Sequence, residues 1–259
     1  MLENIAFYLL KIGHITFILP VAVLGMIVSA RHQDRYLKAA ACLFWVMIIN
    51  TVLKLLFKVP LMPHLGHGFA FPSGHMHASC AFYGFLAYEI KKPSVRAVLM
   101  LLLALLGSSL IIRHYHDLKD VLGAATFFVT EITLYHQLTR RGGAVVTMLI
   151  AIISAVGAMI YLKTLGPVPF HVWLAFWGLA GCLITLALAP NIELKPRALS
   201  TAIATLITAG AFLAMMRLFK YLDFKAYYLS EIRAGLAPII VISIKAATKR
   251  FMQRFVKTS

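Results

Sequence analysis

Apolar stretches close to the length of a membrane-spanning helix recur along almost the whole chain, and they limit the possible folds more than any other feature. The hydrocarbon core of a bilayer requires about 20 mostly apolar residues per helical span. Segments of this kind lie at residues 5–30, 37–57, 74–90, 97–113, 119–138, 144–163, 170–189, 199–217 and 228–245. A mean hydropathy of +0.86 and a 61% share of hydrophobic residues exclude an ordinary soluble domain. The sequence therefore predicts an all-α, polytopic transmembrane helix bundle.

The first and last apolar segments are the least regular candidates for a membrane span. The last segment carries Glu231 and Arg233, and its cleanly apolar part, 234–244, is too short to span a bilayer alone. An interfacial or tilted helix is the alternative, so eight or nine spans are possible. The first segment has no clear cleavage site, and we expect it to be retained as a helix. With no long polar linker in between, residues 1–259 are expected to form one integral membrane domain.

Basic residues gather in alternate loops. The formal net charge of +16 is compatible with nucleic-acid binding, but membrane proteins also concentrate Lys and Arg in their cytoplasmic loops. More than half of the 25 basic residues fall on one side of the predicted bundle: Arg31, Arg35, Lys38, Lys91, Lys92, Arg96, Arg140, Arg141, Lys195, Arg197, Lys245, Lys249, Arg250, Arg254 and Lys257. The positive-inside rule makes that side cytoplasmic. We expect a bacterial-type inner membrane protein with its N-terminus outside, its C-terminus inside if there are nine spans, and no nucleic-acid partner.

A first polar signature, Phe-Pro-Ser-Gly-His at 71–75, precedes the third span on the non-cytoplasmic side. Pro72 and Gly74 interrupt the approach to the span, and Ser73 is a suitable cap for the helix that follows. Free backbone N–H groups and the helix dipole make such a helix start favourable for an anion. His75, in the first turn, could donate a proton to a leaving oxygen or hydrogen-bond to a phosphoryl group. A plain turn with a helix cap is the alternative.

A second polar signature, Arg-His-Tyr-His-Asp-Leu-Lys-Asp at 113–120, precedes the fifth span on the same side. His116 and Asp120 are four residues apart, so they share a face if the helix has already begun at His116. The carboxylate could then orient the imidazole and stabilise its cationic form. An isolated pair with this spacing is often only a helix start, but His75 is expected at the same membrane level. The two signatures together predict one outward-facing phosphate site.

These residues resemble the three-part signature of the type 2 phosphatidic acid phosphatase superfamily. The matching positions are Lys54, Pro-Ser-Gly-His at 72–75, and His116 with three residues before Asp120, followed by Val-Leu-Gly at 121–123. The resemblance covers about residues 35–140 in order, spacing and predicted sidedness. It implies a six-helix, phosphatase-like core, to which the helices at 144–245 would be an addition. It also implies activity on lipid phosphates.

The resemblance implies a role for each matched residue. His116 matches the nucleophile that takes up the phosphoryl group, Asp120 its orienting partner, and His75 the acid that protonates the leaving alcohol. The implied phosphate ligands are Lys54, Ser73 and the backbone N–H of Gly74. This scheme requires neither a metal nor a cofactor.

Two arginines of the family pattern are missing. Leu61 and Leu110 stand where the family has arginine, seven residues after Lys54 and six before His116. Arg113 follows Leu110 by about one turn, so we expect it to reach the phosphate from a shifted register. An interfacial arginine that snorkels toward water is the alternative. Further positive charge is expected from Lys58, His64 or His67, although a solvated loop is the simpler interpretation of the two histidines.

Three functions fit these observations. The leading hypothesis is a membrane lipid phosphatase that takes a lipid phosphate or pyrophosphate monoester from the bilayer and hydrolyses it through a phosphohistidine at the non-cytoplasmic face. The missing arginines keep open a lipid phosphotransferase, as in sphingomyelin synthases, which pass a phospho-headgroup to another lipid. A transporter or an inactive scaffold is the third possibility. Polar residues inside the predicted spans favour it, although each also fits a helix end or an interhelical hydrogen bond: His14, Glu131, His136 and His171.

Overall fold

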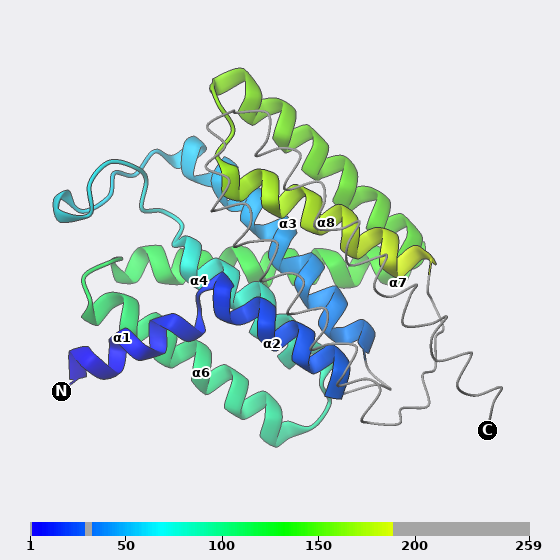
Figure 1. Ribbon diagram of the computed structural model, residues 1–259, viewed down its shortest axis with the longest axis horizontal. Coiled ribbons are helices and arrows are strands. Elements are labelled where there is room, and N and C mark those ends of the chain that lie inside the picture. Colours follow the sequence, from blue (N-terminus) through cyan, green and yellow to red (C-terminus); the bar gives the residue numbers. More distant parts are fainter. Residues whose placement is uncertain (1, 29–32, 189–259) are drawn as a thin grey trace, which may run out of the picture.

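The computed structural model describes residues 2–28 and 33–188, and within these residues every regular element is helical (Figure 1). The elements are α1 (Leu2–Ile12), α2 (Ile15–Val28), α3 (Gln33–Phe57), η2 (Pro63–Leu65), α4 (Gly74–Ser79), η3 (Cys80–Gly84), α5 (Phe85–Glu89), α6 (Pro93–Ile112), α7 (Leu118–Leu165) and α8 (Phe170–Leu188). The predicted all-α class is confirmed for this part of the chain. The two segments expected at 199–217 and 228–245 lie outside the described residues.

Several of these helices are suited to a bilayer. By length and composition, three in the described ranges could cross a membrane: Asp34–Phe57, Pro93–Ile112 and Leu118–Leu165. The bent pair Glu3–Ile12 and Ile15–Met26 would make a fourth. Large apolar side chains remain exposed on the outer helix faces, among them Val98, Leu101, Ile153 and Ile160. Exposure of apolar side chains on this scale agrees with a lipid environment.

The first predicted span is not one straight helix. Residues 5–30 were expected to form a continuous segment, but α1 and α2 meet at a bend of 52°. His14 opens α2, because its Nδ1 accepts a hydrogen bond from the backbone N–H of Thr16 at 3.4 Å. Gly13 lies close against α4, where an added Cβ would be 2.7 Å from Ser79 Oγ. Local capping and this close approach break the span where hydropathy alone does not.

The fifth and sixth predicted spans form the two arms of α7. Gly143 breaks the helix between them with φ 75° and ψ 179°, a conformation that favours glycine. The arms meet at an angle on the right of Figure 1. The expected division between 119–138 and 144–163 is therefore confirmed, although only a single non-helical residue separates the arms.

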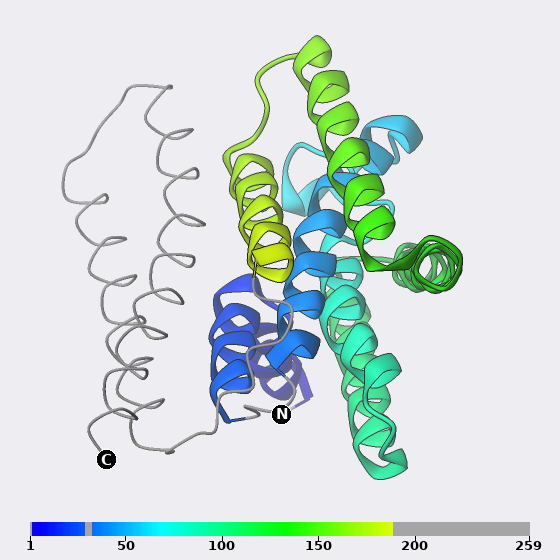
Figure 2. The same ribbon diagram turned by 90° about the vertical axis from the view of Figure 1, so that its right-hand side faces the viewer.

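Helix α3 forms the centre of the bundle. It contacts α2, α4, α7 and α8, and Figure 2 shows α2 and α8 on one side of it with α4 and α6 on the other. Its buried residues Leu43, Val46 and Ile48 share one core with Phe82 and Phe85. The polar ends of α3 and α4 therefore reach the same end of the bundle. The six-helix core that the family resemblance implies stays a prediction.

Candidate functional site

The two polar signatures lie against each other, although 37 residues of chain separate them. The backbone N–H of Ser73 donates to the carbonyl oxygen of Asp120 at 3.1 Å. The ring of Phe71 rests on Gly123, where an added Cβ would be 2.7 Å from Phe71 Cζ. The first turn of α7 therefore supports the turn that precedes α4.

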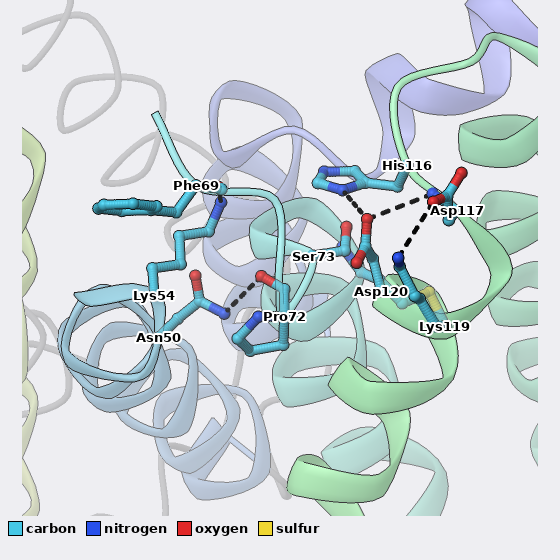
Figure 3. A network of polar contacts seen from close by, with 10 residues as sticks. Asn50, Lys54, Phe69, Pro72, Ser73, His116, Asp117, Lys119 and Asp120 are labelled. Atoms are coloured by element: carbon cyan, nitrogen blue, oxygen red, sulfur yellow. Dashed lines mark hydrogen bonds and ion pairs between the residues drawn. The ribbon is translucent and has the colours of Figure 1, made fainter. Parts of the chain in front are cut away.

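His116 and Asp120 form a buried pair. Imidazole Nδ1 lies 3.3 Å from Asp120 Oδ2, and this oxygen also accepts the backbone N–H of Asp117 at 3.2 Å (Figure 3). His116 is 7% exposed and Asp120 2%. An ionised carboxylate only accepts hydrogen bonds, so Nδ1 carries the proton and Nε2 keeps its lone pair. The pair therefore leaves Nε2 as the ring nitrogen with an available lone pair.

The helical setting of this pair differs from the prediction. His116 was expected on one helix face with Asp120, but α7 begins only at Leu118, with Asp117 as its N-cap residue. His116 thus belongs to the connection between α6 and α7. The contact forms because Asp120, in the first turn of α7, points back toward that connection. Burial lowers the pKa of His116, and the hydrogen bond with Asp120 opposes this shift, so the imidazole is neutral near pH 7.

A cavity of about 600 Å³ joins both signatures to Lys54, which is within the usual size range of ligand pockets. Lys54 lines it from α3, Gly74 and His75 line it from α4, and His116 lines it from the α6–α7 connection. Lys54 Nζ donates to the carbonyl oxygen of Phe69 at 2.6 Å (Figure 3). Among the described residues, this lining contains no Asp or Glu. The cavity is therefore suited to an anion.

Gly74 and Ser73 contribute in different ways. A Cβ on Gly74 would be 3.3 Å from Asn50 Oδ1 and 3.8 Å from Lys54 Cε, so the glycine lets both side chains approach the turn. Ser73 is fully buried, and its Oγ accepts the backbone N–H of Met76 at 3.4 Å. The predicted helix cap is confirmed. Ser73 was also expected as a phosphate ligand, but it does not line the cavity.

The expected substitutes for the missing arginines lie elsewhere. Arg113 is the C-cap residue of α6, does not line the cavity, and pairs with Glu3 at 3.5 Å. Lys58 and His67 are exposed on the loop between α3 and α4 and are also absent from the lining. Within the described residues, none of these three cations lines the cavity.

Two other histidines line the cavity from outside the region of resemblance. His14 comes from the break between α1 and α2, and His171 comes from the first turn of α8. The ring centroids of His14 and His75 are 5.9 Å apart. Since His14 Nδ1 accepts from Thr16, its proton resides on Nε2, which is left as a donor. In the sequence each is only a polar residue in an apolar segment, a pattern that favours a transporter or scaffold.

Comparison with known proteins adds no relative. No family model, curated protein or solved structure matches this chain. In residues 2–28 and 33–188, no three His, Cys, Asp or Glu side chains are grouped so that they could hold a metal ion. Function is therefore inferred from the geometry of the cavity and from the motifs that line it.

Proposed function

We propose that this protein is a membrane lipid phosphatase that resembles the type 2 phosphatidic acid phosphatases and acts through a phosphohistidine. One observation carries the proposal: His116, oriented by the buried Asp120, opens onto the same acid-free cavity as Lys54, Gly74 and His75. The arrangement supplies a nucleophile with an orienting group, a second histidine for proton transfer and a cation for the phosphate. The substrate class is a lipid phosphate or pyrophosphate monoester.

The reaction follows from the positions of these groups. Nε2 of His116 attacks phosphorus and the bond to the lipid oxygen breaks, while His75 gives its proton to that oxygen. A bound phosphate dianion favours the protonated imidazole that this step requires. Asp120 stabilises the cationic phosphohistidine through Nδ1–H. His75 then takes a proton from water, the oxygen of that water attacks phosphorus, and the phosphorus–nitrogen bond breaks to release phosphate.

Charge on the phosphoryl oxygens is neutralised without the family's two arginines. Lys54 provides a cation at the cavity, and its ammonium has donors beyond the one given to Phe69. His14 and His171 supply further N–H donors from the α1–α2 break and from α8. In this proposal the C-terminal part of the described chain is thus part of the site. The apolar share of the lining, which includes Leu162 and Leu165 of α7, would face the lipid portion of the substrate.

Lipid phosphotransfer is the second candidate, and the loss of both arginines favours it. Leu110 is 1% exposed within the core, so the structure has apolar packing where the family carries a guanidinium. A weaker grip on free phosphate is compatible with transfer to a second lipid alcohol. The phosphohistidine step is common to both reactions, and only the acceptor differs.

The test measures products from purified protein in detergent micelles. Phosphatidic acid, phosphatidylglycerol phosphate and a polyprenyl pyrophosphate are supplied separately, with and without an acceptor lipid. We expect free phosphate without any acceptor, and loss of this product in His116→Ala. Asp120→Asn should lower turnover by at least about 100-fold, because the amide no longer enforces the Nδ1–H tautomer.

The matched control is Lys119→Ala, which removes an exposed ion pair with Asp117 at 3.6 Å and should leave turnover unchanged. Product formation that depends on an added acceptor would replace the phosphatase by a phosphotransferase. Unchanged turnover in His116→Ala would refute the mechanism. Absence of either product with every lipid would favour a scaffold or transporter.

A further inference from the structure

Beside the phosphate cavity, which Asn50 helps to line, side chains from three helices form a buried chain of hydrogen bonds. Asn50 of α3 lies 3.1 Å from His77 Nδ1 of α4, and His77 Nε2 lies 3.0 Å from Glu131 Oε2 of α7. His77 is completely buried, Asn50 is 6% exposed, and the Glu131 side chain is 11% exposed. None of the three belongs to the motifs of the proposed active site. Such groups are costly in an apolar interior unless they are fully paired.

The amide of Asn50 connects this chain to the phosphate turn. Its Nδ2 donates to the carbonyl oxygen of Pro72 at 3.4 Å (Figure 3). The same Nδ2 also faces His77 Nδ1, so both amide hydrogens have acceptors. Asn50 Oδ1 lies against Gly74. On the opposite side, the backbone N–H of Ser73 is held by the carbonyl oxygen of Asp120. The turn is therefore restrained from α3 and from α7 at adjacent residues.

These contacts select one tautomer of His77. Because Asn50 donates to Nδ1, the imidazole proton resides on Nε2, where the Glu131 carboxylate accepts it. The other tautomer would turn N–H groups of Asn50 and His77 toward each other. Relieving that clash by rotating the Asn50 amide would bring Oδ1 to the carbonyl oxygen of Pro72 and lose that bond. The restraint on Pro72 thus depends on Glu131 through His77.

We infer that Asn50, His77 and Glu131 are positioning residues that hold the Pro72–Gly74 turn in the geometry required by the phosphate cavity. This inference rests on the proposed function in so far as the turn binds phosphate. Asn50 lines the cavity, whereas His77 and Glu131 do not. A purely structural role, in which the three side chains only join α3, α4 and α7, is the competing explanation.

Two substitutions of His77 separate the two ends of the network. In His77→Asn, the amide oxygen can take the place of Nδ1 and keep the bond from Asn50, while the contact with Glu131 is lost. In His77→Gln, the amide nitrogen can take the place of Nε2 and keep Glu131, while Asn50 loses its acceptor. We expect kcat to stay within roughly threefold of the native value in His77→Asn and to fall roughly tenfold or more in His77→Gln.

Hydrogen–deuterium exchange of the peptide covering 72–77 gives a readout that does not depend on turnover. We expect faster exchange in His77→Gln and in Asn50→Leu, and native exchange in His77→Asn. Native exchange in all three variants would overturn the inference. If the native protein releases no phosphate from any lipid, the proposed function fails, whereas this exchange pattern still decides whether the network holds the turn.

A triple variant distinguishes positioning from simple helix joining. Replacing Asn50, His77 and Glu131 together by Leu removes every polar member, and buried polar groups replaced by apolar ones often cost no stability. We expect a thermal midpoint equal to or above the native one, with kcat still roughly tenfold or more below native. Recovery of native kcat in this triple variant would show that the network only joins helices and would refute the inference.

Discussion

Substitution of Gly123 by Ala tests the contact that brings the two signatures together. An added Cβ would lie 2.7 Å from Phe71 Cζ and 3.2 Å from Cδ2, and closer still to Cε2. The ring has little room to retreat, because it packs edge-on against Phe57 with centroids 4.9 Å apart and also contacts Phe127. The expected result is a strained contact between α7 and the residue that precedes Pro72.

The magnitude follows from two opposing effects. Overpacking at such a contact costs about 1–3 kcal/mol, while Ala in place of Gly in a helix interior gains about 1 kcal/mol. In the native background, Gly123→Ala should therefore lower the free energy of unfolding by about 0–2 kcal/mol. In a Phe71→Ala background the ring is gone, so the same change should raise it by about 1 kcal/mol. The coupling between the two positions is then about 1–3 kcal/mol.

The assay is a double-mutant cycle of equilibrium unfolding in mixed micelles, with phosphate release measured in parallel. Gly157→Ala is the matched control on the same helix, because its Cβ would meet no atom within 4 Å and the change should raise the free energy of unfolding by about 1 kcal/mol. Turnover should fall in Gly123→Ala because Phe71 adjoins the phosphate turn. An equal effect of Gly123→Ala in both backgrounds would refute the packing argument.

Three further predictions concern the cavity. Burial holds the pKa of His116 below its ordinary 6.5, so the neutral imidazole persists to more acidic pH. Carbethoxylation of His116, followed by mass spectrometry across a pH series, should therefore have its midpoint below pH 6.5. A midpoint above pH 6.5 would contradict the assignment. Arg113 pairs with Glu3 outside the cavity, so Arg113→Leu should lower kcat/KM by less than roughly threefold in steady-state assays. A larger loss would show that Arg113 binds the phosphate. His14→Ala and His171→Ala should each raise KM for the lipid phosphate roughly three- to tenfold, as expected for one hydrogen bond, and unchanged KM in both would exclude them as ligands.

Much of the fold could be predicted from apolar segment length. The boundaries of α3 and α6 follow from runs of apolar residues that end in polar ones, a property of local sequence. The bend at Gly13–His14 could not be predicted in this way, because it depends on the approach of Ser79 from another helix. The start of α7 after His116, rather than before it, depends on Asp117 as the N-cap residue.

The candidate site, too, could be predicted from the sequence only in part. Spacing within one segment brings His116 to Asp120, because four residues near a helix start are never far apart. Spacing carries no information on His14, His77 or His171, whose partners and cavity lie on other helices. Arg113 shows the converse: its register on α6 suggested the phosphate, yet it pairs with Glu3 of α1.

The amino-acid sequence is sufficient for the membrane class, the helical segments and the paired signatures, because hydropathy, capping and short spacing act between neighbours along the chain. Packing of distant helices adds the rest. It joins the signatures through the Ser73–Asp120 backbone bond, brings two unexpected histidines to the cavity, and forms the Asn50–His77–Glu131 network behind it. These contacts depend on which helix faces meet, and that is set by the whole core rather than by any local pattern.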